Sequence, residues 1–230
     1  MKYSFYVLLT IVLFVFGCEK KIPEENIPLI PEENTPLEIK KYDGSIYDFL
    51  VHHEGGNYDS LLRVLDRLPL IKTYLKDESK TSTFFAIDNR SFESAIRNMN
   101  IARNANGLKS LFIKDIDVSV LEVLLDRYIF EDKYDSKAIG LFVDGVQLFS
   151  LVHEYQMRAY PELEAKDDVF VKNPDKLIFS DTNDSFNEIM WDSTNIVDTD
   201  WETSKGVVHI LESEHEFGFG KLTAYLSGKY

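Results

Sequence analysis

Histidine and carboxylate residues lie next to each other at several points of the chain, so metal and acid–base chemistry is the first possibility to consider. The segment His52-His53-Glu54 has no second histidine one helical turn later, as a zinc-binding helix requires, and His153-Glu154 and His215-Glu216 lack it too. Residues 181–192 imitate a calcium loop, but Phe186 stands where that loop needs glycine for its sharp turn. We therefore expect no metal site and no cofactor.

The signals of other catalytic classes are also missing. No glycine-rich phosphate loop and no G-x-S-x-G nucleophile turn occurs in the sequence. The 39 acidic residues supply many accidental carboxylate pairs, but none is singled out for glycoside hydrolysis. We expect that the protein is not an enzyme, and a hydrolase stays open as a remote alternative.

The single cysteine, Cys18, can form no disulfide within the chain, and its position suggests another role. It follows one positive charge at Lys2 and an apolar run from Phe5 to Phe16, which has the size of a secretory signal core rather than of a spanning helix. Charged residues follow it at once. This arrangement resembles a bacterial lipoprotein signal, so we expect residues 1–17 to be removed and Cys18 to be acylated, which would attach the chain to a lipid bilayer.

Two copies of an eight-residue repeat follow the cysteine, IPEENIPL at 22–29 and IPEENTPL at 30–37. Each copy holds two prolines, which remove amide donors and disfavour both helix and central strand. The four glutamates keep the segment solvated. We therefore interpret residues 18–43 as a semi-extended, lipid-anchored linker.

Composition limits what the remaining chain can be. With 25 basic and 39 acidic residues the net charge is −14, which disfavours nucleic acid and anionic membrane surfaces as partners. Hydrophobic residues make up 44% of the chain, enough for a compact core. We predict one domain over residues 44–215 and a C-terminal extension over residues 216–230.

Within that domain the hydrophobic patterns predict a mixture of helices and strands. Helices are expected over 45–52, 57–68, 91–99 and 118–130, with Asn57, Ser91 and Asp117 as caps and Pro69 as a stop. Strands are expected over 81–87, 176–180 and 206–212. A hairpin that turns at Asp144-Gly145 is expected over 141–151.

Three segments, in order, resemble the conserved boxes of the fasciclin (FAS1) domain family. They are Thr83 to Phe92 (TFFAIDNRSF), Leu124 to Tyr134 (LLDRYIFEDKY) and Asp200 to Leu211 (DWETSKGVVHIL). The resemblance implies an α+β fold, with two β-sheets in a wedge and several helices around them. We interpret the box residues as mainly structural. They are Thr83, Phe85, Ala86, Asn89, Phe92, Tyr128, Gly206, Val207, Val208 and His209.

The sequence departs from the family pattern at three box positions and in one connection. Ile87 replaces the proline of the first box, Lys205 replaces the asparagine of the last, and Tyr128 replaces the histidine of the middle one. The connection over 152–173 is longer and more acidic than the family's usual one. Its aromatic residues are Tyr155, Tyr160 and Phe170, and we interpret them as possible ligand contacts.

Together these features predict an exported, lipid-anchored, fasciclin-like protein of a Gram-negative bacterium, located at the outer membrane and facing either the cell surface or the periplasm. We expect it to act as a non-enzymatic adhesion or binding module with a protein or glycan ligand. The aromatic insert favours one alternative, an accessory subunit of an outer-membrane glycan-uptake complex.

Overall fold

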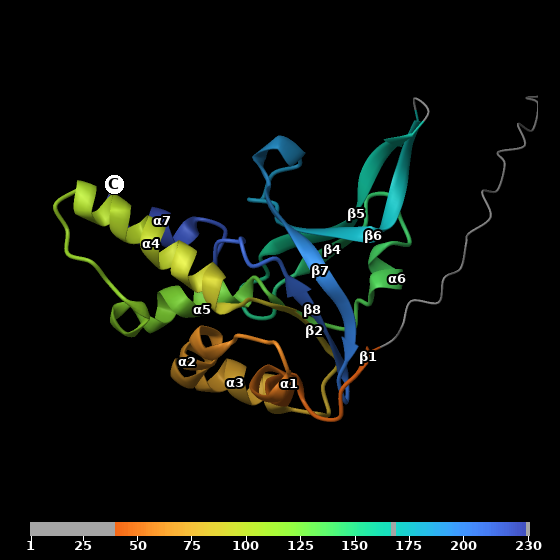
Figure 1. Cartoon of the computed structure of the whole chain (residues 1–230), viewed down its shortest axis with the longest axis horizontal. Helices are drawn as coiled ribbons and strands as arrows, with labels where there is room; N and C mark the ends of the chain where they lie inside the picture. Colours follow the sequence, from red (N-terminus) through yellow and green to blue (C-terminus); the bar gives the residue numbers. More distant parts are fainter. Residues whose placement is uncertain (1–39, 167–168, 229–230) are drawn as a thin grey trace, which may run out of the picture. The chain divides into compact units, whose positions relative to one another are not determined.

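The computed structural model describes residues 40–166 and 169–228 (Figure 1). These residues belong to the unit Glu38–Tyr230. The expected signal peptide, the lipidation site Cys18 and the linker up to residue 39 lie outside the described residues. Among the residues that are described, no helix is both long and apolar enough to cross a membrane.

The first half of the unit is mainly helical, and its helices begin at polar caps. The Ser45 hydroxyl accepts a hydrogen bond from the Asp48 amide at 3.1 Å, and the Asp48 carboxylate accepts one from the Ser45 amide, also at 3.1 Å. Asp117 caps α5 by accepting from the Ser119 amide at 2.8 Å. The elements of this half are α1 Ile46–His52, α2 Asp59–Arg67, α3 Pro69–Lys76, α4 Asn89–Ala105, η1 Ile113–Asp115 and α5 Val118–Asp126.

Local predictions of helix ends were wrong at three places. Asp88, and not Ser91, caps α4, because its carboxylate accepts from the Ser91 amide at 3.0 Å. The N-cap of α2 is Tyr58, which makes no capping side-chain hydrogen bond, so Asn57 is not the cap. The stop at Pro69 is confirmed, and this proline also begins α3, where a proline at the first position loses no hydrogen bond. Helix α5 ends at Asp126, because residues 129–131 pair with a neighbouring strand instead of continuing the helix.

The strands form one sheet in the order β3-β2-β8-β7-β6-β5-β4, with β1 beside β7. Strands β2 and β8 are parallel, as are β1 and β7, and the other neighbours are antiparallel. Their bounds are β1 Lys40–Lys41, β2 Ser82–Ala86, β3 Ile129–Glu131, β4 Val146–Phe149, β5 Gln156–Lys166, β6 Val169–Asp181, β7 Asp192–Glu202 and β8 Gly206–Leu211.

The predicted α+β class is confirmed, and the sheet is continuous where the sequence resemblance implied two. Strand β7 pairs with β6 through its first half and with β8 over most of its length. Two register shifts interrupt the pairing with β8, between Ile196 and Asp198 and between Asp198 and Trp201. Because such bulges bend and twist a strand, β7 can join the two halves of the sheet in one hydrogen-bonded path (Figure 1).

The expected hairpin at Asp144-Gly145 is not formed. Strand β4 begins after Gly145 and pairs with β5, while residues 136–145 form the short helix α6 (Ser136–Ile139) and a turn. Gly145 has φ 66°, and a Cβ atom there would lie 2.0 Å from the Ala159 carbonyl oxygen. The glycine is therefore needed for close backbone approach to β5 rather than for a hairpin turn.

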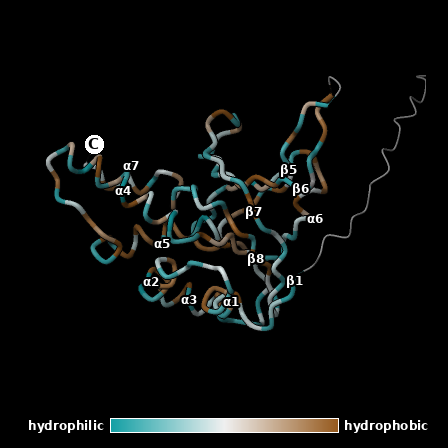
Figure 2. Tube along the Cα trace, in the orientation of Figure 1, coloured by the Kyte–Doolittle hydropathy of each residue, from teal (hydrophilic) through white to brown (hydrophobic). Residues whose placement is uncertain are grey.

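Hydrophobic residues concentrate where the helices meet the sheet (Figure 2). Phe85 of β2 stacks on Phe179 of β6 with ring centroids 3.9 Å apart. The residues predicted as a C-terminal extension contribute to the same core, since Phe217, Phe219 and Leu222 are buried in it. The last helix, α7 (Lys221–Leu226), lies along α4 (Figure 1).

Candidate functional site

The three segments that resemble the fasciclin boxes lie side by side in the sheet. Strand β2, from the first box, pairs with β8 from the last, and Phe85 stands opposite His209. Strand β3, from the middle box, pairs with the other edge of β2, where Thr83 stands opposite Phe130. Thr83 also stands opposite Val207, so residues 124 positions apart in the chain are neighbours in one central unit.

Most of the box residues are buried in this unit. Thr83 joins two segments, because its hydroxyl donates to the Asp132 carbonyl and accepts from the Tyr134 amide, each at 2.9 Å. Asn89 fixes the start of α4 to that of α2 by accepting from the Ser60 amide at 2.7 Å. The remaining box residues are buried, and they are Phe85, Ala86, Phe92, Tyr128, Gly206, Val207, Val208 and His209.

His209 is held as a neutral imidazole. Its Nε2 donates to the Tyr134 carbonyl at 2.8 Å, and its Nδ1 accepts from the Asp200 amide at 3.4 Å. Burial lowers the pKa of His209, since the charged form would lose its hydration. Both ring nitrogens are occupied within the fold, so the imidazole serves structure and offers no free nitrogen to a substrate.

A second buried histidine lies in the tail that follows β8. Its Nε2 lies 2.7 Å from the Tyr128 hydroxyl, which also accepts from the Gly218 amide at 2.8 Å. Burial lowers the pKa of His215 to about 3. Tyr128, at the position where the fasciclin resemblance implies a histidine, therefore contacts an imidazole of the tail, and the pair attaches that tail to the core.

Buried carboxylates likewise hold loops together. Asp126 accepts from the Ser150 hydroxyl at 2.6 Å and from the amides of Val152 and His153 at 2.9 and 2.8 Å. Asp200 accepts from the Ser136 amide at 2.7 Å. The hydrogen bonds of these carboxylates therefore go to backbone and hydroxyl donors within the fold.

In the segment with calcium-loop spacing, a lysine ammonium group lies where a bound cation would lie. The Lys221 Nζ lies 3.0 Å from Asp181 Oδ2 and 3.9 Å from Asp192 Oδ2, and it donates to the Asn183 side-chain oxygen. An ammonium group from α7 thus stands among the oxygens that a cation would use. In the described part of the chain, no group of three or more metal-binding side chains is present.

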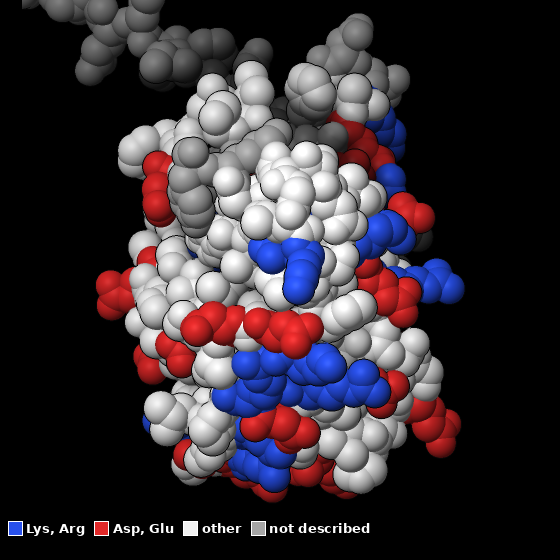
Figure 3. All heavy atoms as spheres, turned by 90° about the vertical axis from the view of Figure 1, so that its left-hand side faces the viewer, with Lys and Arg blue, Asp and Glu red and all other residues white. Residues whose placement is uncertain are grey.

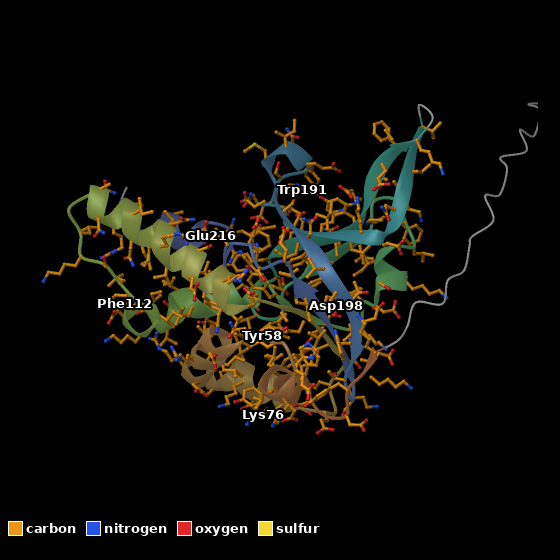
Figure 4. The ribbon with its side chains drawn as sticks, viewed as in Figure 1. Tyr58, Lys76, Phe112, Trp191, Asp198 and Glu216 are labelled. Atoms are coloured by element: carbon orange, nitrogen blue, oxygen red, sulfur yellow. The ribbon has the colours of Figure 1, made fainter. Side chains whose placement is uncertain are left out.

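The most exposed apolar residues of the described unit include those of the loop between β6 and β7. Phe186 is 99% exposed, Ile189 is 89% exposed and Met190 is 59% exposed. The loop contains the short helix η2, Glu188–Met190, and protrudes from the sheet with Trp191 at its base (Figure 4). From the sequence, this segment was interpreted only as an imitation of a calcium loop that lacks the required glycine.

Hydrogen bonds hold this loop in one conformation. The Trp191 indole donates to the Ser185 carbonyl at 2.8 Å, and the Asn183 amide group donates to the Met190 carbonyl at 2.6 Å. The Asn187 side chain accepts from the Ile189 amide at 3.1 Å. Asn183 and Asp184 adopt positive φ, which these short polar residues tolerate better than most. The apolar side chains are therefore presented by an ordered loop.

A small hollow of about 100 Å³ lies between this loop and the outer face of the sheet. The face alternates along β5, where Met157 and Ala159 are buried in the core and Gln156, Arg158 and Tyr160 are on the opposite side. The Arg158 guanidinium lies 5.5 Å from the centre of the Trp191 ring, a cation–π arrangement. Amide, guanidinium and aromatic groups thus meet at one place.

The three aromatic residues expected as ligand contacts are not brought together. Tyr160 does not line the hollow, but it meets Trp191, which does, edge-on with ring centroids 6.0 Å apart. Tyr155 is half-buried beneath Arg127, whose guanidinium lies 3.7 Å from the ring centre. Phe170, which is 73% exposed, stands opposite Ala165 near the far end of the β5–β6 ribbon.

Comparisons with known proteins give a structural likeness and no match in sequence. No family model matches the chain, and no curated protein matches it. Among solved structures, the chain is similar to a FAS1 domain pair from the insect cell adhesion molecule fasciclin I, with 12% identity and a TM-score of 0.48. The match covers 75% of this chain and 50% of that one, so this chain spans half the length of the pair.

Proposed function

We propose that this protein is an exported, lipid-anchored, fasciclin-like module that binds a macromolecular partner and catalyses no reaction. The observation that carries the proposal is the ordered loop with Phe186, Ile189 and Met190 turned to solvent. Side chains of this size each contribute about 1.5–3 kcal/mol when they are fully buried. A partner that covers the loop would gain this contribution, and the loop's hydrogen bonds reduce the entropy that binding costs.

The polar groups inside the domain support a binding role over a catalytic one. His209 and His215 are buried with lowered pKa values, and Asp126 and Asp200 accept hydrogen bonds from fixed backbone donors. Each group therefore has a structural role that accounts for it. The fasciclin resemblance of the sequence leads to the same expectation, an adhesion or binding module.

The location is proposed from sequence. Cys18 after an apolar run and before charged residues supports acylation, and the acidic, proline-rich linker supports a tether between lipid and domain. Attachment at the outer membrane or cell surface would present the loop of the domain to partners outside the bilayer. Adhesion to a neighbouring surface is the function that this arrangement favours.

The test is binding of the purified mature chain, with Cys18→Ala for solubility, to arrays of glycans and of cell-surface proteins. The variant F186S/I189S/M190S removes the apolar loop, and L70S/I101S is a matched control. Leu70 is 81% exposed on α3 and Ile101 is 63% exposed on α4, so the control removes similar exposed surface elsewhere. We expect specific binding that the loop variant weakens about tenfold or more, a loss of about 1.4 kcal/mol, while the control binds like the unmodified chain.

Two results would contradict the proposal. One is equal binding by the loop variant and the unmodified chain. The other is turnover of any arrayed substrate, because a catalytic chain would restore the hydrolase alternative.

A second candidate function, an accessory role in glycan uptake, is favoured by the hollow beside the loop. Trp191 offers an aromatic ring to this hollow, and Gln147 and Gln156 offer amide groups suited to hydroxyl-rich ligands. Gln147→Ala distinguishes the two functions, because Gln147 lines the hollow from β4 and does not belong to the loop. It should weaken binding to a glycan that uses the hollow, and it should affect a protein partner of the loop much less.

A further inference from the structure

A larger groove lies on another side of the domain, between α2, α4 and η1. Its volume is about 440 Å³, which is within the range of small-molecule sites. Phe92, Ile96 and Ile113 give it an apolar lining, and Phe112, which is 58% exposed, stands at this side of the molecule (Figure 4). None of these residues belongs to the loop on which the proposed function rests.

The walls of the groove are fixed to each other. The Arg67 guanidinium of α2 donates to the carbonyls of Ile113 and Ile116 at 2.5 and 2.7 Å, which attaches η1 to α2. Asn100 of α4 donates to the Leu111 carbonyl and accepts from the Leu111 amide, each at 2.8 Å. The segment that carries Phe112 and Ile113 is thus held from both sides, and the groove is present without a ligand.

The charge of the groove is opposite to that of the chain. Its lining includes Arg63, Arg67 and Lys114 but the single carboxylate Glu93, whereas the whole chain has a net charge of −14. Figure 3 shows basic side chains gathered on this side of the molecule between acidic ones. Within the described residues, neither Arg63 nor Lys114 forms an ion pair. Two cations beside an apolar lining are therefore available to a ligand.

From this arrangement we propose that the groove binds a small organic anion, an aromatic or branched apolar body that carries a carboxylate or sulfonate. The body would be buried against Phe92, Ile96 and Ile113, where it leaves water. The acidic group would pair with Arg63 and Lys114 at the rim, where charge-assisted hydrogen bonds form without full desolvation of either partner.

Fluorescence titration at neutral pH tests this with two related probes. Anilinonaphthalene sulfonate has the proposed chemistry, and N-phenylnaphthylamine is its uncharged counterpart. The double variant R63Q/K114Q removes the cations and leaves the apolar lining. We expect it to raise the dissociation constant of the sulfonate about tenfold and to leave that of the uncharged probe unchanged.

Matched controls separate this site from general effects. K137Q/K166Q makes the same change of charge on α6 and β5, outside the groove, and should bind both probes like the unmodified chain. Ile96→Trp should weaken both probes by filling the groove. The proposal is overturned if the sulfonate does not bind the folded chain, if R63Q/K114Q binds it unchanged, or if that variant weakens both probes equally.

Discussion

The Asp181 carboxylate lies 2.9 Å from Nε of Arg127, and the two side chains are only 5% and 4% exposed. The same carboxylate oxygen lies 3.0 Å from Nζ of Lys221, the first residue of α7. One buried anion therefore joins the end of β6, the residue after α5 and the C-terminal helix. Asp181 is the first residue of the segment with calcium-loop spacing, residues 181–192. Its carboxylate pairs with Arg127 and Lys221, which gives it a structural role.

Removing this anion should destabilise the fold strongly. Asp181→Asn leaves Arg127 and Lys221 without their shared partner, and breaking a buried ion pair in this way costs about 3–5 kcal/mol. Urea denaturation followed by circular dichroism measures the free energy of unfolding.

The control for this prediction is Asp66→Asn. Asp66 pairs with Lys72 at 2.6 Å but is 63% exposed, and exposed pairs contribute little. Our interpretation of the Asp181 cluster is wrong if D181N loses no more stability than D66N.

The buried histidines should make the domain sensitive to mild acid. The pKa of His215 is about 3 in the folded chain, against 6.5 for an ordinary histidine. Below about pH 6.5 the unfolded chain therefore binds a proton that the folded chain does not. The free energy of unfolding is highest above that pH and should fall by up to about 1.4 kcal/mol per pH unit as the pH drops toward 4. His209, whose pKa is also lowered, acts with the same sign.

His215→Gln isolates the contribution of one histidine. The glutamine side-chain oxygen can accept from the Tyr128 hydroxyl but does not titrate. Urea denaturation between pH 7 and pH 4.5, a range chosen around the ordinary histidine pKa, should give a shallower pH dependence for the variant than for the unmodified chain. Equal slopes would mean that His215 is not held neutral.

Gly206 should not tolerate a side chain. A Cβ atom there would lie 2.7 Å from the Ser82 carbonyl oxygen and 2.8 Å from Cδ1 of Ile46, so β8 and β2 would have to separate. We expect Gly206→Ala to cost about 1–3 kcal/mol, the usual range for overpacking. At Gly140 the nearest contact of an added Cβ is 3.2 Å, so Gly140→Ala should cost less. Thermal denaturation compares the two variants, and a larger loss from G140A would contradict the assigned role of Gly206.

The sequence predicted the elements whose signals are local. The apolar run of β2, the β-branched residues of β8 and the Asp117 cap of α5 are local signals, and each was predicted at nearly the observed position. Predictions failed where a distant strand decides the outcome. Residues 129–131 continue the helical pattern of α5 but become β3, because β2 offers them backbone partners. Likewise, Asp144-Gly145 has the residues of a hairpin turn, but β4 pairs with β5.

Fewer residues of the candidate site were predicted from the sequence. Of the three aromatic residues that the insert suggested, only Tyr160 contacts a residue of the hollow, because its place on β5 brings it against Trp191. Trp191, Phe186 and Arg158 were missed, since only the folded loop shows which apolar side chains are left in solvent. The unusual combination of Phe186, Ile189, Met190 and Trp191 in an otherwise polar loop was the available signal.

The proposed lipid anchor predicts a modified N-terminus. Mass spectrometry of the N-terminal peptide from the membrane fraction should find a chain that begins at Cys18 and carries acyl groups. Cys18→Ala should release the domain from membranes, since acyl chains supply the attachment. A chain that still begins at Met1 and stays in the membrane after this substitution would contradict the lipoprotein assignment.

The most direct test of the proposed adhesion role is protease shaving of intact cells that carry the full chain. A module that adheres to neighbouring surfaces has to be exposed, so we predict that the domain is lost from unpermeabilised cells while a periplasmic marker stays intact. Protection of the domain until the outer membrane is opened would contradict the adhesion role.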